Sequence, residues 1–116
     1  MAQFLMLLRD TQESSDSFTP ESAQAIIEDY KSWSRKMGEA GKLVSGNKLT
    51  NEGGRIARSS ANGLVVTDGP FAEAKEVIGG FWLMNAADYA EAESLIADCP
   101  HLKYGGLIEL RQIDEI

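Results

Sequence analysis

The sequence predicts an α+β fold, a ferredoxin-like βαβ-βαβ sheet with an added β-hairpin. Three observations lead to this class. The chain has 116 residues, the length of a single domain, and 43% of them are hydrophobic. Short apolar runs typical of strands alternate with two stretches whose apolar residues recur every three or four positions, as on amphipathic helices. Between the two helical stretches lies Asn62-Gly63, a dipeptide that favours a two-residue hairpin turn.

The first half of the chain contains a predicted strand and a long helix. Residues 3–9 are mostly apolar and typical of a strand, whereas the polar residues 10–18 are typical of a loop. Thr19 followed by Pro20 indicates a helix start, because threonine caps the first turn and proline fits the first helical position. Gly41 predicts the helix end. The apolar stripe of this helix consists of Ala23, Ile26, Ile27, Tyr30, Trp33, Met37 and Ala40.

The second half contains the remaining strands and a shorter helix. Residues 68–80 are expected to form a loop. Asp88, with Glu91 three residues later, forms a capping-box pattern at the start of the shorter helix. Its apolar stripe runs to Cys99, and Pro100 ends it. Strands are predicted at residues 41–46, 55–61, 64–68, 81–84 and 107–113.

Two of these strands, residues 4–8 and 81–84, are apolar at consecutive positions. Strand side chains alternate between the two faces of a sheet, so both faces of these strands are hydrophobic. Both helical crossovers place their helices on the same face. The sequence therefore predicts that a second copy covers the other face, giving a homodimer. The alternative is that the loops at residues 10–18 and 68–80 cover it within one chain.

Composition disfavours several partners and locations. The 18 acidic residues outnumber the 11 basic ones, giving a net charge of −7, which is unfavourable for binding nucleic acid or an acidic membrane surface. No apolar stretch approaches the ~20 residues that span a bilayer, and the N-terminal apolar run is too short for a signal peptide. The lone Cys99 rules out an intramolecular disulfide and fits a reducing compartment. We expect one cytoplasmic domain, residues 1–116.

Residues 68–76 read Asp-Gly-Pro-Phe-Ala-Glu-Ala-Lys-Glu and lead through Gly79-Gly80 into an apolar strand. This segment resembles the DGPF branch of the YCII-related family, and the likeness extends over nearly the whole chain, including residues 108–111. The resemblance implies ferredoxin-like domains that pair into a dimeric α/β barrel. Relatives of this kind are mostly uncharacterised, and some are encoded with or fused to sigma-factor-like regulators. Structurally similar barrels include cofactor-free monooxygenases and lactone isomerases.

The chain departs from the family pattern at two places. Ala74 replaces the hydroxyl residue of the loop motif. In the YCII branch, a histidine on the long helix and an aspartate just before a proline are proposed as a catalytic pair. The aligned positions hold Tyr30 and Cys99 here, so that pair is not carried over.

The motif loop supplies the first candidate site. Asp68-Gly69-Pro70 is typical of a turn, and Phe71 is suited to anchoring the loop on apolar surface. Glu73, Lys75 and Glu76 place two carboxylates and an amine within four residues, beside a strand that enters the expected cleft. Such groups can act as an acid, a base and an anion clamp. The alternative is an ion-pair cluster at the surface or the interface.

The last strand supplies a second candidate. If Ile108 and Leu110 face the helices, then Glu109 and Arg111 point into the space between paired sheets. A charge pair inside an apolar cleft is typical of ligand sites, and an ion pair at the interface is the alternative. His101 is the only histidine and has no nearby carboxylate or second ligand in the sequence, so we expect it at the surface.

Neither metal nor cofactor binding is indicated. No spacing of His, Cys, Asp and Glu matches a metal-ligand pattern. The Gly53-Gly54 and Gly79-Gly80 pairs do not precede a helix start as phosphate-binding loops do. The sequence therefore predicts no metal and no cofactor.

Two functions remain open from the sequence. The first is a cofactor-free enzyme that performs proton transfer, isomerisation or hydrolysis on a small organic molecule, in a cleft between paired sheets. The second is a ligand-sensing or protein-interaction module without turnover, linked to a transcription regulator. For the enzyme, the catalytic candidates are Asp68, Lys75 and Glu76, and the ligand-binding candidates are Arg111, Glu109, Glu73 and Phe71.

Overall fold

The computed structural model describes residues 2–11, 20–50, 54–68 and 76–116. Strands and helices alternate along the chain in the order predicted for a ferredoxin-like fold. The elements are β1 (Ala2–Thr11), α2 (Pro20–Glu39), β2 (Leu43–Lys48), β3 (Arg55–Ser60), β4 (Gly63–Asp68), β5 (Glu76–Ala86), α3 (Tyr89–Ile96), α4 (Pro100–Lys103) and β6 (Leu107–Gln112).

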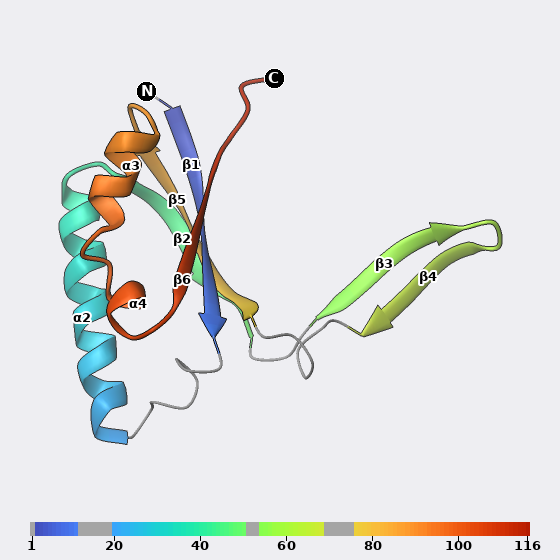
Figure 1. The fold of residues 1–116 in the computed structure, drawn as a ribbon, viewed down its shortest axis with the longest axis horizontal. Helices are drawn as coiled ribbons and strands as arrows, with labels where there is room; N and C mark the ends of the chain where they lie inside the picture. The colour runs from blue at the N-terminus through green and yellow to red at the C-terminus, as the bar shows by residue number, and fades with distance from the viewer. Residues whose placement is uncertain (1, 12–19, 51–53, 69–75) are drawn as a thin grey trace.

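Four strands form one sheet in the order β2-β5-β1-β6, with every neighbouring pair antiparallel. The strands that α2 connects, β1 and β2, lie on either side of β5. The strands that the α3–α4 segment connects, β5 and β6, lie on either side of β1. The three helices cover one face of the sheet, as Figure 1 shows. The predicted ferredoxin-like α+β fold is confirmed.

The two faces of the sheet differ because the strand side chains alternate. Phe4 and Met6 are fully buried against the helices, where they pack with a core that includes Trp33 and Met84. The intervening side chains lie on the opposite face, which we call the open face. Strand register aligns them across the sheet: Leu5 lies opposite Leu83, and Leu7 lies opposite Phe81. The prediction that these strands are hydrophobic on both sides is confirmed.

The helix boundaries follow local signals. Gly41 has φ of +74°, and the N–H of Lys42 donates to the carbonyl of Met37 at 2.9 Å, which closes α2 as predicted. The side chain of Asp88 accepts from the N–H of Glu91 at 2.9 Å, as the capping box predicts. The Glu91 carboxylate accepts from the N–H of Ala87 rather than from that of Asp88. Thr19, the predicted cap of α2, lies outside the described residues.

Several predicted boundaries are wrong. β5 begins at Glu76 instead of residue 81, because its pairing with β1 continues to the Thr11–Glu76 pair. Of the residues expected in loops, 10 and 11 belong to β1, 68 belongs to β4 and 76–80 belong to β5. Pro100 begins the short helix α4, in addition to following the end of α3. Proline is accepted there because the first helical residue needs no N–H donor.

The predicted hairpin exists, but its turn is one residue earlier than expected. Ser60 pairs with Gly63, so the turn consists of Ala61 and Asn62. Gly63, with φ of +111°, supplies the left-handed conformation, and Asn62 does not have positive φ.

This hairpin, residues 54–68, forms a separate two-stranded sheet that we call the arm. Figure 1 shows the arm extending away from the sheet, on the side opposite the helices. Leu64, Val65 and Val66 are all exposed on it. Within the described residues, no helix has the length and apolar character needed to cross a bilayer.

Candidate functional site

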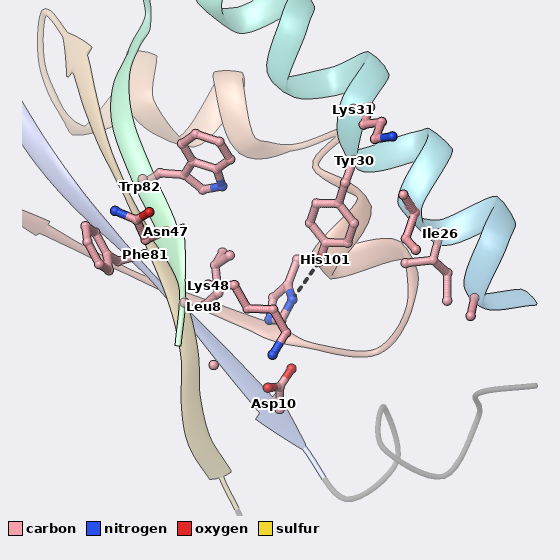
Figure 2. A pocket seen from close by; sticks show the side chains of 15 residues that line it. Leu8, Asp10, Ile26, Tyr30, Lys31, Asn47, Lys48, Phe81, Trp82 and His101 are labelled. Atoms are coloured by element: carbon pink, nitrogen blue, oxygen red, sulfur yellow. Dashed lines mark hydrogen bonds between the residues drawn. The ribbon is translucent and has the colours of Figure 1, made fainter. Parts of the chain in front are cut away.

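A pocket of about 630 Å³ opens between the sheet and α2. Its volume lies within the ~300–1,000 Å³ typical of small-molecule sites. Leu8, Ile26 and Trp82 contribute apolar walls. Figure 2 shows that Asp10 and Lys48 extend into the pocket from the sheet and Tyr30 from α2, with His101 behind them. A few polar groups among apolar walls are the usual composition of a ligand site.

Tyr30 and His101 are joined by a hydrogen bond inside this pocket. The Tyr30 hydroxyl lies 2.9 Å from Nδ1 of His101, and Nε2 of the same ring lies 2.9 Å from the backbone oxygen of Arg9. A carbonyl oxygen can only accept a hydrogen bond. Nε2 therefore carries a proton and donates a hydrogen bond to the backbone oxygen of Arg9. In the neutral ring, Nδ1 is therefore the acceptor, and the Tyr30 hydroxyl donates to it. The geometry thus assigns one tautomer to His101.

The surroundings favour the neutral forms of the nearby tyrosine and cysteine. Burial raises the pKa of Tyr30, and the negative charges that Cys99 and Asp10 can carry raise this pKa further. Burial also raises the pKa of the Cys99 thiol, to about 11, so this group remains a thiol at neutral pH. Tyr30 therefore keeps its proton for donation to His101, and Cys99 is not activated as a nucleophile.

Three glycines leave the space that the pocket side chains occupy. An added Cβ at Gly46 would collide with the ring of Trp82, and one at Gly79 would collide with the carboxylate of Asp10. An added Cβ at Gly106 would collide with three ring atoms of His101. Two sheet strands and the turn before β6 therefore accommodate the pocket groups only because these positions lack side chains.

A cluster next to the Tyr30–His101 pair ties α4 to α2. The Tyr104 hydroxyl donates to the Asp29 carboxylate at 2.5 Å, and Lys103 Nζ donates to the same carboxylate at 3.1 Å. Asp29 precedes Tyr30 on α2, and Lys103 ends α4, which carries His101. The cluster therefore holds together the two helices that supply the pair.

We expect Asp29→Asn to reduce the amount by which the free energy of unfolding falls as the solution is made acidic. The hydrogen bond from Tyr104, followed by that from Lys103, holds the pKa of Asp29 below its usual value of 3.8. This carboxylate therefore stabilises the fold above the pKa of the unfolded chain, and the contribution is lost as pH falls through the lower folded-state pKa. Urea unfolding over a pH series measures the effect. Glu93→Gln removes the same charge at an exposed position on α3, and an equal reduction in both variants would contradict the assignment.

Comparison with known proteins identifies the family. The model of the YCII-related domain matches residues 2–116. The uncharacterised protein R00369 of Rhizobium meliloti (strain 1021) is 31% identical over 96 residues, which cover 82% of this chain and 77% of that protein. The chain belongs to the YCII-related family. The resemblance to the YCII-related family that the sequence motifs indicate is confirmed.

A solved structure is similar to this YCII-related protein in fold. It is 5-chloro-2-hydroxyhydroquinone dehydrochlorinase from Burkholderia phenoliruptrix AC1100, in complex with 2,5-dihydroxybenzoquinone. The TM-score is 0.51 at 17% identity, and the match covers 97% of this chain and 93% of that one. At this identity the likeness supports the ferredoxin-like α+β fold.

The candidates from the motif loop are only partly described in this YCII-related protein. Asp68 lies at the end of the arm, with a side chain 90% exposed and 3.5 Å from Arg55. Glu76 begins β5. The Glu76 side chain and the other loop candidates lie outside the described residues, so their joint site stays a prediction. These other candidates are Phe71, Glu73 and Lys75.

The candidates on the last strand are brought together on the open face. Ile108 and Leu110 pack against the core, as the prediction required. Glu109 Oε2 lies 3.6 Å from Arg111, and Glu109 Oε1 accepts from Arg9 Nη1 at 2.9 Å. These charged side chains form an ion-pair cluster, and Glu109 and Arg111 do not line the pocket at α2.

The expectation for His101 is wrong, because this residue is only 7% exposed and both ring nitrogens are hydrogen-bonded. Its partner Tyr30 is 71 residues away in the chain, so no local spacing connects them. Asp10 lies in a stretch that the sequence predicts as a loop, and no pattern in the sequence indicates it as a site residue. One signal did point to the pocket: Tyr30 occupies the position aligned with the helix histidine of the family. Among the described residues, no group of His, Cys, Asp and Glu is arranged to hold a metal.

Proposed function

We propose that this protein is a cofactor-free enzyme that moves a proton on a small hydroxylated ring compound, with Tyr30 and His101 as the reacting pair. The observation that carries the proposal is the Tyr30–His101 hydrogen bond inside a pocket of small-molecule size. Positioned pairs of this kind perform general acid–base catalysis. The enzyme hypothesis from the sequence is thus kept, with the reaction assigned to a different pocket.

The proton path follows from the tautomer of His101. A substrate hydroxyl gives its proton to the Tyr30 oxygen, while Tyr30 gives its own proton to Nδ1 of His101. The products are a substrate oxyanion and an imidazolium, and total charge is conserved. Burial raises the pKa of Tyr30, which disfavours a free tyrosinate, so the two protons move together. The carboxylate of Asp10 lines the same pocket, and its negative charge raises the pKa of Tyr30 further.

Return of the proton completes the reaction. The oxyanion delocalises its charge to a ring carbon, and the pair returns the proton to that carbon through Tyr30. The net result is an isomerisation in which no atom is gained or lost. This sequence needs neither a redox partner nor a metal.

The walls of the pocket favour a flat ring that bears hydroxyl groups. Trp82 offers an aromatic surface, Leu8 and Ile26 add apolar contacts, and Lys48 provides a cation suited to a ring oxyanion. A similar fold carries 2,5-dihydroxybenzoquinone in the dehydrochlorinase complex. That compound has acidic hydroxyls on a flat ring, and we propose compounds of the same class as ligands here.

Tyr30→Phe is expected to weaken binding of 2,5-dihydroxybenzoquinone about five- to tenfold, the usual effect of losing one hydrogen bond. Calorimetric titration measures the affinity. Tyr89→Phe is the matched control, because it removes a hydroxyl that accepts from the backbone N–H of Gln112 and does not line the pocket. The proposal fails if the wild type does not bind this class of compound, or if Tyr89→Phe weakens binding as much as Tyr30→Phe.

A ligand-sensing module without turnover is the second candidate, since the same pocket serves binding alone. The two functions differ in proton exchange. In heavy water, an enzyme of the proposed kind accelerates deuterium entry at the ring carbons of the bound compound, and a sensing module does not. Loss of this acceleration in Tyr30→Phe supports catalysis by the pair.

The motif loop remains part of the proposal. Residues 69–75 lead through β5 to Gly79, which lines the pocket. We therefore keep Glu73, Lys75 and Glu76 as candidates for contacts with a ligand, together with Asp68 and Phe71. Glu109 and Arg111 remain candidates on the open face.

A homodimer is also proposed, formed through the open face. Leu5, Leu7, Phe81 and Leu83 make this face apolar, and a second copy is the partner most readily matched to it. The arm, on which Leu64, Val65 and Val66 are exposed, extends from the same side of the sheet. A cytoplasmic location remains a proposal, which the free, buried Cys99 supports.

A further inference from the structure

We infer that Glu109 is a positioning residue for His101 and acts through Arg9 from the opposite face of the sheet. The inference rests on the proposed function, because it concerns the control of the same pocket. It also assigns a role to an ion pair that lies outside that pocket.

Arg9 contacts both sides of the sheet. Its backbone oxygen accepts from Nε2 of His101 at 2.9 Å, on the side of the helices. Its guanidinium donates to Oε1 of Glu109 at 2.9 Å. Glu109 lies opposite Leu7 in the register, so the ion pair belongs to the open face. One residue thus connects the pocket histidine to a carboxylate across the sheet.

The backbone of Arg9 is held less regularly than the rest of β1. Against β5, the register shifts between Leu8 and Arg9, which pair with Gly80 and Ile78 and leave Gly79 as the extra residue. Against β6, the pairing ends at Arg9 and Leu107. Bulges bend a strand and redirect its groups, and they are common beside functional sites. The side-chain ion pair is therefore an important additional restraint on where the Arg9 oxygen points.

The ion pair is sheltered enough to act as such a restraint. The side chains of Arg9 and Glu109 are each 35% exposed, compared with 63% and 90% for the Arg55–Asp68 pair on the arm. Partial burial strengthens an ion pair because less water screens it. A second copy on the open face would bury it further, so assembly would tighten the restraint on His101.

Loss of the Glu109 charge should therefore change the tautomer of His101. A relaxed Arg9 oxygen accepts less well from Nε2, and the Nδ1–H tautomer then gains population. That tautomer has no acceptor for the Tyr30 proton. Glu109 thus supports the proton path without touching the substrate.

Nitrogen-15 NMR of the histidine ring tests the inference, because His101 is the only histidine in the chain. In Glu109→Gln, we expect the chemical shifts of Nδ1 and Nε2 to move toward each other. We also expect the Nε2 proton to exchange with water about two- to fivefold faster, which corresponds to the free energy of a partly exposed ion pair. Arg111→Gln is the matched control, since it removes another charged partner of Glu109 on the same face and keeps the Arg9 side chain unaltered. Sedimentation at the same protein concentration checks that the variants compared have the same oligomeric state.

Unchanged histidine signals in Glu109→Gln, or equal changes in Arg111→Gln, would overturn the inference. If Glu109→Gln does not fold, Arg9→Lys provides the same readout, because it keeps the charge but offers a single-point donor. The measurement uses no ligand. A wild type that binds no dihydroxybenzoquinone while Glu109→Gln changes the histidine signals would refute the proposed function and leave the positioning role standing.

Discussion

Gly106→Ala is expected to lower the free energy of unfolding by about 1–3 kcal/mol, the usual cost of overpacking a filled interior. Gly106 is buried, and the added methyl group would overlap the Nε2, Cε1 and Cδ2 atoms of His101. The ring is held on both sides, by Tyr30 and by the Arg9 oxygen, so it must leave these hydrogen bonds to make room. We therefore expect the loss of stability to be accompanied by loss of the assigned tautomer.

Urea unfolding and the nitrogen-15 signals of His101 measure the two effects together. Gly38→Ala is the control, because nothing lies within 4 Å of the added methyl group at this position in the last turn of α2. Alanine should stabilise that helix by up to about 1 kcal/mol. A Gly106→Ala protein with wild-type stability and unchanged histidine signals would show that the pocket is not packed as described.

Phe4→Ala is expected to cost about 3–5 kcal/mol of folding free energy, as for other fully buried phenylalanines. Phe4 is 0% exposed and packs edge-to-face on Tyr89, with 4.8 Å between the ring centroids. Small domains have total stabilities of about 5–15 kcal/mol, so this one change removes a large share. Thermal and urea unfolding measure the loss.

The neighbouring Leu5 separates core packing from self-association. Leu5→Ser changes the open face and leaves the core side of β1 intact. We expect it to weaken the proposed homodimer in sedimentation experiments, with a smaller loss of stability than Phe4→Ala. If the wild type sediments as a single copy at all concentrations, the proposed role of the open face is wrong.

Much of the fold was predictable because hydrophobic periodicity reports which faces are buried. The consecutive apolar residues of β1 indicated two hydrophobic faces, and Gly41 and Asp88 marked helix boundaries at the right positions. The start of β5 is missed because Glu76 continues a motif that resembles a loop and the Gly79-Gly80 pair interrupts the apolar run before Phe81. The turn of the hairpin was displaced by one residue because Gly63 supplies the positive φ from the start of β4.

The pocket was much less predictable, because its members come from distant segments. Tyr30 belongs to the apolar stripe of α2, where a tyrosine is ordinary core material. His101 follows a proline without a carboxylate near it in sequence, and its partner carbonyl belongs to Arg9, a backbone group that no side-chain pattern reveals. The charged candidates are recognisable in the sequence because they lie within a few residues of one another. Hydrogen bonds across 71 and 92 residues can be found only once the chain is folded.

The three glycines beside Trp82, Asp10 and His101 give the pocket an unusual vulnerability. We expect the proposed chemistry to be lost without a change in any group that carries it, because a single added methyl group at one of these positions would overlap the side chain concerned. Among relatives, conserved polar residues would therefore be insufficient grounds for inferring a shared reaction. The positions equivalent to 46, 79 and 106 must also remain empty of side chains.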